Sequence, residues 1–178
     1  MAEPSGAEWC KKFPGSRSVD DLAEPFRTSV KAFLAALTNA GAQVAINATL
    51  RPPERAYLMH FAWEIARNGL SPSEVPPKTG VDIEWDHTGA VQAAEDMVEG
   101  YGMRAEAVLD GNHMKGLAID MEVSWTGSIE LVDAHGAART ITSPRGNANP
   151  ALQAVGLTYG VQKLSVAIDE PHWSIDGH

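Results

Sequence analysis

The chain has 178 residues, of which 44% are hydrophobic and 21% are charged, and its 14 Lys and Arg residues stand against 23 Asp and Glu residues. This composition is typical of a folded globular protein that needs no disulfide or structural metal for its core, and it excludes a collagen-like, disordered or wholly coiled-coil chain. The net charge of −9 argues against a protein that binds nucleic acid or anionic lipid through a broad basic surface. Cys10 is the single cysteine, which excludes an intrachain disulfide and a zinc finger.

The N-terminal residues lack the features of a secretory signal. Met1 to Trp9 has neither a cationic start nor an apolar run, and no stretch of the chain approaches the roughly 20 consecutive apolar residues of a membrane-spanning helix. We therefore expect synthesis in the cytoplasm without a signal peptide, and no insertion into a membrane.

Helical and strand periodicities alternate along the chain. Apolar residues at helical spacing predict a helix between Val19 and Leu37, in which Pro25 is tolerable only near the start. Alternation predicts a strand from Val44 to Ala48, and an apolar stripe predicts a second helix from Glu54 to Asn68. The remaining expected elements are a helix over Thr88 to Glu99, strands over Gly116 to Val123, Ser128 to Val132 and Ala138 to Thr142, a short helix from Pro150 to about Val155, and strands over Gln162 to Ile168 and His172 to Ile175.

The order of these elements predicts the fold class. Helices precede most of the strands, so we expect an α+β fold in which helices pack on a mainly antiparallel sheet, and not repeating βαβ units. No linker divides the sequence, so we expect a single domain over residues 1–178, with residues 1–18 as an irregular N-terminal segment.

Two short segments carry residue types that bind metals. His113 and Asp120 are seven residues apart, and Asp169 and His172 lie near the C-terminus. Two imidazoles and a carboxylate, with one coordination position left open, suit a catalytic zinc ion. In a straight strand His113 and Asp120 would lie ~23 Å apart on opposite faces, and in a helix ~10 Å apart. We expect a turn at Gly116 to fold His113 back from a loop while Asp120 points out of the following strand.

This arrangement of residues resembles the M15 family of zinc peptidases. The motif H-x-x-G-x-A-x-D is matched by His113, Gly116, Ala118 and Asp120, and about fifty residues later follows an acid-x-x-His-aromatic segment. An arginine just after the first core strand is the third element, and Arg51 occupies that place. The family includes D-Ala-D-Ala carboxypeptidases and dipeptidases and L-alanyl-D-glutamate endopeptidases, and its fold group also holds the hedgehog signalling domain. The resemblance covers residues 44–173.

The resemblance implies a role for each matching residue. His113, Asp120 and His172 would be the zinc ligands within a hedgehog/DD-peptidase-like catalytic domain. Asp169 would be the general base, and an Asp at this place favours an endopeptidase over a carboxypeptidase. Arg51 would contact the substrate and help to stabilise the oxyanion.

Two assignments near the second motif have competing interpretations. Simple alternation along a strand would put Glu170, not Asp169, on the same side as His172, but Pro171 breaks the alternation. The resemblance places the family's acid three residues before the last histidine, so we expect Asp169 to be the base. Trp173, next to the expected ligand, is a candidate for binding substrate at the cleft, and packing against the sheet is the alternative.

The resemblance predicts a zinc-dependent peptidase that hydrolyses a stem-peptide bond of peptidoglycan, either L-Ala-D-Glu or a bond to D-Ala. Without a signal peptide, such an enzyme would reach the cell wall in the periplasm after delivery or release, as a phage endolysin or as an antibacterial effector with an immunity protein as partner. The alternative is a hedgehog-like binding module that keeps the zinc and lacks turnover. A Ser or Cys hydrolase has little support, because no G-x-S-x-G elbow occurs.

Overall fold

The structure is a computed structural model that describes residues 2–164 and 170–178. It confirms the α+β class and the mainly antiparallel strand pairing. By its internal contacts the chain forms two compact units, unit 1 of Met1–Gly15 and Arg51–Gly111 and unit 2 of Ser16–Leu50 and Asn112–His178. The single domain expected over 1–178 stays a prediction. No helix in the described residues is both long enough and apolar enough to cross a membrane.

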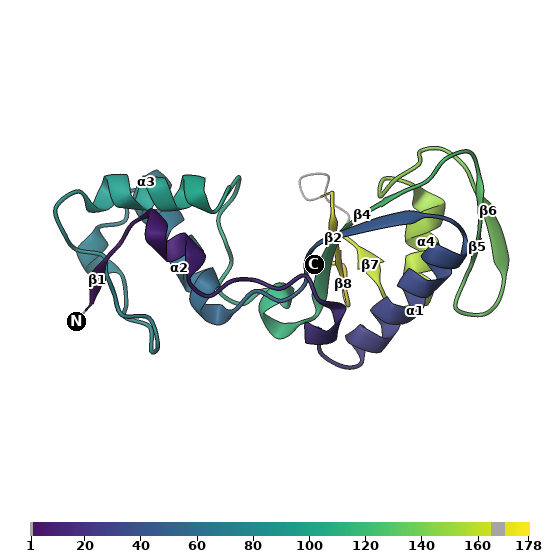
Figure 1. The fold of residues 1–178 in the computed structure, drawn as a ribbon, viewed down its shortest axis with the longest axis horizontal. Coiled ribbons are helices and arrows are strands. Elements are labelled where there is room, and N and C mark those ends of the chain that lie inside the picture. Colours follow the sequence, from purple (N-terminus) through teal and green to yellow (C-terminus); the bar gives the residue numbers. More distant parts are fainter. Residues whose placement is uncertain (1, 165–169) are drawn as a thin grey trace. The chain divides into compact units, whose positions relative to one another are not determined.

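Unit 1 is mainly helical (Figure 1). Its elements are β1 (Glu3–Pro4), a 3-10 helix (Ala7–Lys11), α2 (Pro53–Trp63), a π-helical turn (Glu64–Asn68), a 3-10 helix (Pro72–Glu74), β3 (Ile83–Glu84) and α3 (Ala90–Gly100). β1 and β3 pair in parallel. The prediction of an irregular segment over 1–18 is therefore wrong for its first part. The physical reason is Trp9, which is 4% exposed and packs in the core of unit 1 with side chains of α2 and α3.

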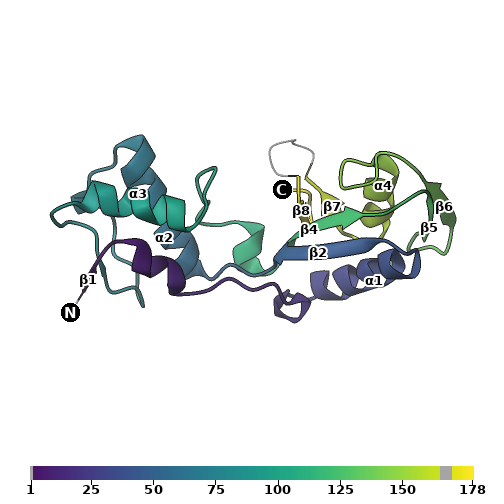
Figure 2. The ribbon, with the colours of Figure 1, turned by 45° about the horizontal axis from the view of Figure 1, so that its top comes forward.

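Unit 2 holds the larger sheet. Its elements are a 3-10 helix (Val19–Asp21), α1 (Phe26–Asn39), β2 (Gln43–Ala48), a 3-10 helix (Asn112–Lys115), β4 (Ala118–Ser124), β5 (Ile129–Val132), β6 (Ala138–Ile141), α4 (Pro150–Thr158), β7 (Gln162–Lys163) and β8 (His172–Ser174). Four strands form an antiparallel sheet in the order β2-β4-β8-β7, and β5 and β6 form a hairpin. α1 lies along one face of the sheet (Figure 2).

The core of unit 2 lies between that face and α1. The buried side chains of α1 are Phe26, Val30, Phe33 and Leu37. They share one hydrophobic cluster with alternate residues of β4, namely Ile119, Met121 and Val123. Because successive strand residues point to opposite faces, the residues between them on β4 point away from the core. The outward face of β4 is therefore the polar one, and it carries Asp120.

The expected elements agree with the observed ones except at their ends. α1 begins at Phe26, directly after Pro25, and a separate 3-10 helix covers Val19–Asp21, because proline is accommodated only at a helix start. The second expected helix continues through α2 into the π-helical turn that ends at Asn68. Residues 165–168 of the expected closing strand lie outside the described residues.

Gly116 makes the turn between the short helix that carries His113 and strand β4. Its φ angle is +67°, a conformation that residues with a Cβ rarely adopt. A Cβ at Gly116 would also lie 2.8 Å from the backbone nitrogen of Ala23. The same segments are joined by a hydrogen bond from the Ala23 N–H to the Gly116 carbonyl, at 2.9 Å. The expected turn at Gly116 is confirmed, and it needs glycine for both backbone angle and space.

Gly116→Ala is expected to lower the free energy of unfolding more than Gly127→Ala does. Gly127 has the same φ of +67°, and a Cβ added there would meet nothing within 4 Å, so it reports the cost of the backbone angle alone, about 1–2 kcal/mol. Gly116→Ala adds the backbone clash, for a further ~1 kcal/mol or more. Urea unfolding of the two variants measures the difference, and equal losses would contradict the tight packing at Gly116.

Candidate metal centre

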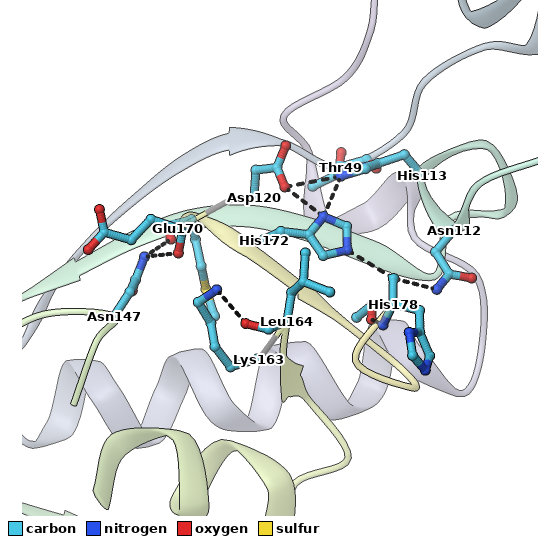
Figure 3. A network of polar contacts seen from close by, with 12 residues as sticks. Thr49, Asn112, His113, Asp120, Asn147, Lys163, Leu164, Glu170, His172 and His178 are labelled. Carbon is cyan, nitrogen blue, oxygen red and sulfur yellow. Dashed lines mark hydrogen bonds and ion pairs between the residues drawn. The ribbon is translucent and has the colours of Figure 1, made fainter. Parts of the chain in front are cut away.

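Three potential metal ligands converge on the outward face of the unit 2 sheet (Figure 3). Asp120 on β4 lies directly opposite His172 on β8 in the antiparallel register, so their side chains are cross-strand neighbours. His113 comes from the 3-10 helix Asn112–Lys115 that precedes the Gly116 turn. One ligand atom from each of the three residues lies within 4.8 Å of the other two. The structure thus brings together His113, Asp120 and His172 as the sequence predicted.

The three ligand atoms form a nearly equilateral triangle. His113 Nε2 lies 3.1 Å from Asp120 Oδ1 and 3.3 Å from His172 Nδ1, and His172 Nδ1 lies 3.1 Å from Asp120 Oδ1. Tetrahedral zinc with ligand bonds of about 2.0–2.1 Å requires about 3.3 Å between any two of its ligand atoms. The spacing of the triangle therefore fits a tetrahedral ion.

The other nitrogen of each imidazole faces a backbone carbonyl. His113 Nδ1 lies 2.8 Å from the carbonyl oxygen of Thr49, and His172 Nε2 lies 3.1 Å from that of His178. Since a carbonyl only accepts hydrogen bonds, we assign the imidazole protons to these two nitrogens. A bond from the far N–H to a carbonyl or carboxylate is the usual support of a metal-binding histidine.

This proton assignment leaves only acceptors at the centre of the triangle. In their neutral forms His113 and His172 present two nitrogen lone pairs to each other and to the carboxylate of Asp120. Such groups repel one another unless a proton or a cation lies between them. Two imidazoles and one carboxylate, all buried or half-buried, are a ligand set that zinc accepts.

The electrostatics of Asp120 agree with its place among these groups. Burial by itself would raise the pKa of Asp120, but when His113 and His172 carry an additional proton on the nitrogens that face it, their hydrogen bonds and positive charge outweigh the burial and hold the pKa well below its usual value. A cation bound in place of those protons would act in the same direction. Asp120 is therefore ionised at neutral pH, as a metal ligand must be.

The residues predicted beside the ligands fall in different places. Trp173 faces the core and not the solvent: its side chain is 0% exposed and packs against Phe33, with ring centroids 5.7 Å apart. Trp173 therefore packs against the sheet, and the prediction that it binds substrate at a cleft is wrong. Strand alternation explains this, because the residues on either side of Trp173 in β8 face the opposite side of the sheet. Arg51 belongs to unit 1, and its contact with substrate stays a prediction.

The predicted general base, Asp169, lies outside the described residues. Its neighbour Glu170 is exposed, and the Glu170 carbonyl accepts a hydrogen bond from Asn147 Nδ2 at 3.1 Å. The same amide group donates to the Met121 carbonyl at 2.8 Å. The buried side chain of Asn147 therefore fixes the backbone beside the predicted base to strand β4 (Figure 3).

Sequence reasoning missed the groups that support the imidazoles and the backbone at Glu170. The carbonyls of Thr49 and His178 are backbone atoms, so no residue type marks them. Asn112 and Asn147 are polar residues in expected loops, where asparagine is common for reasons of turn geometry. The adjacency of Asn112 to His113 was the one available signal.

Comparison with known proteins adds no assignment. No protein-family model matches the chain, and no curated protein sequence matches it. Function is therefore inferred from the geometry described above.

Zinc is expected to stabilise the protein through this centre. A ligand that binds only the folded state at 100 times its Kd adds about 2.7 kcal/mol to the free energy of unfolding. His113→Ala should abolish most of that gain. His135→Ala, at an exposed position in the turn between β5 and β6, should keep it. Thermal unfolding with and without zinc measures both, and an undiminished gain in His113→Ala would place the zinc elsewhere.

Proposed function

We propose that the protein is a zinc-dependent peptidase of the M15 type, with a hedgehog/DD-peptidase-like catalytic fold. The observation that carries the proposal is the triangle of His113 Nε2, Asp120 Oδ1 and His172 Nδ1, with the far nitrogen of each imidazole hydrogen-bonded to a carbonyl. Structural zinc sites have four protein ligands, whereas catalytic sites have three and keep one position for water or substrate. The described residues supply three, which favours catalysis over a purely structural ion.

Each of these residues has its own role in the proposed reaction. When bound, zinc would supply Lewis acidity that lowers the pKa of water and polarises a peptide carbonyl. His113, Asp120 and His172 would hold the ion and compensate part of its charge. Asp169 accepts a proton from the attacking water and returns it to the leaving amine. The Arg51 guanidinium donates hydrogen bonds to the substrate and offsets the negative charge that develops on the carbonyl oxygen.

A hollow on the surface of unit 2, along the strand that carries Asp120, offers room for a peptide. It has a volume of about 470 Å³ and is lined by residues 43–45 of β2, residues 122–124 of β4, and Gly146, Asn147, Glu170 and Pro171. Pro171 directly precedes the ligand His172. On β4, Glu122 lies on the same outward face as Asp120 and about 7 Å further along the strand, which is the length of two extended residues.

We propose peptidoglycan stem peptides as the substrate class, with an L-Ala-D-Glu bond or a bond to D-Ala as the site of cleavage. These short peptides carry free carboxylates that an arginine can bind. The net charge of −9 opposes attraction to an anionic cell wall, so binding would depend on local contacts. The proposed settings are a phage endolysin or a delivered antibacterial effector with an immunity protein. A non-catalytic, hedgehog-like zinc module remains the competing proposal.

Digestion of purified peptidoglycan separates the two proposals. The zinc-loaded protein should release peptide fragments, and a chelator should abolish the release until zinc is restored. Mass spectrometry of the fragments identifies the bond that is cut. Folded, zinc-loaded protein that releases nothing with or without chelator would favour the binding module.

The identity of the base is tested by two isosteric substitutions. Asp169→Asn should lower kcat by at least about 100-fold, because it removes the proton acceptor. Glu170→Gln should lower kcat by much less. Both variants are compared at equal zinc occupancy with a stem-peptide substrate. If Glu170→Gln causes the larger loss, Glu170 is the base and strand alternation holds through Pro171.

A further inference from the structure

A turn formed by residues 174–178 supports the far side of the His172 ring. The buried hydroxyl oxygen of Ser174 accepts hydrogen bonds from the backbone N–H groups of Gly177, at 2.8 Å, and His178, at 3.0 Å. Asp176 Oδ1 accepts a further bond from the His178 N–H, at 3.1 Å. These bonds hold the His178 carbonyl oxygen 3.1 Å from His172 Nε2.

The side chain of Asn112 joins this turn to the helix that carries His113. Its Nδ2 donates to Asp176 Oδ1 at 2.7 Å and to the His178 carbonyl oxygen at 2.9 Å. The carbonyl that accepts the His172 proton is therefore also held by the residue next to His113 (Figure 3). One amide group thus links the supports of two of the three ligands.

Among the described residues, two acceptors compete for the single proton of the neutral His172 ring. With the proton on Nε2, the ring donates to His178 and presents the Nδ1 lone pair to the centre. With the proton on Nδ1, the ring would donate to Asp120 Oδ1, which lies 3.1 Å away, and Nδ1 could no longer bind a metal. A His178 carbonyl held within hydrogen-bond distance of Nε2 favours the first tautomer over the second.

We propose that Asn112 and Asp176 are positioning residues that keep the His172 proton on Nε2 and so prepare Nδ1 for zinc. The proposal rests on the metal centre of the proposed function, and it concerns zinc binding and not peptide cleavage. Asn112 holds the carbonyl directly, and Asp176 holds both Asn112 and the His178 N–H. Loss of such supporting hydrogen bonds typically weakens metal binding 10- to 100-fold.

The test uses Asn112→Asp, a substitution of equal size that replaces the donor amide by a carboxylate facing Asp176. Its zinc Kd, measured by competition with a chromophoric chelator, should rise 10- to 100-fold. In the zinc-free protein, nitrogen NMR should find the His172 proton on Nε2 in the parent and shifted toward Nδ1 in the variant. In the double variant N112D/D176N the amide is at residue 176 and the carboxylate at residue 112, so the two side chains can again form a hydrogen bond. This variant should recover part of the zinc affinity.

Asn149→Ala is the matched control for a merely structural effect. Asn149 is a buried asparagine of the same unit that caps the start of α4, and its loss should lower stability without changing the zinc Kd or the His172 tautomer. If Asn112→Asp does not fold, the milder Asp176→Asn is used, with a severalfold rise in Kd expected. A folded Asn112→Asp or Asp176→Asn variant with the parent Kd and the Nε2 proton would overturn the proposal. Absence of peptidase activity would leave these measurements unaffected.

Discussion

The convergence of three hydrogen-bond acceptors on one point is the constraint around which the centre in unit 2 is organised. Lone pairs and a carboxylate oxygen at 3.1–3.3 Å repel one another, so folding alone would not favour bringing them together without a positive charge between them. The hydrogen bonds to the carbonyls of Thr49 and His178 direct the lone pairs inward. The centre is therefore preorganised for a cation by the backbone around it.

The sheet provides the rigid base for this arrangement. Asp120 and His172 are held opposite each other by the pairing of β4 with β8, and their strand neighbours Ile119 and Trp173 point into the core. Burial of a large apolar side chain contributes about 1.5–3 kcal/mol. The same alternation that anchors the two strands in the core thus presents the two ligands on the opposite face. A shift of the β4–β8 register by one residue would exchange the two faces, so both the core packing and the pairing of Asp120 with His172 would be lost.

The third ligand depends on chain geometry outside the sheet. His113 reaches the centre because Gly116 turns the chain in the left-handed region and packs against the backbone at Ala23. The Leu117 N–H closes this loop by a hydrogen bond to the Asn112 carbonyl at 2.8 Å. A local turn, strand pairing and the 174–178 segment each fix one part of the candidate metal centre.

The sequence by itself determined the periodic elements, the α+β class and the three residues that converge at the candidate metal centre. Those properties depend on residue types and short spacings, such as the apolar alternation of β4 and the seven-residue separation of His113 from Asp120. The ends of elements and the order of the N-terminal segment were less predictable. Trp9 is buried in unit 1, within a segment that the sequence pattern alone predicts to be irregular.

Only the tertiary structure decided which nitrogen of each histidine faces the centre and what holds it there. The acceptors are the backbone carbonyls of Thr49 and His178, 64 and 6 residues from their histidines. Every residue carries the same backbone carbonyl whatever its side chain, so no pattern of residue types distinguishes these two. Their role arises from their position in space, which strand pairing and the turn after β8 set.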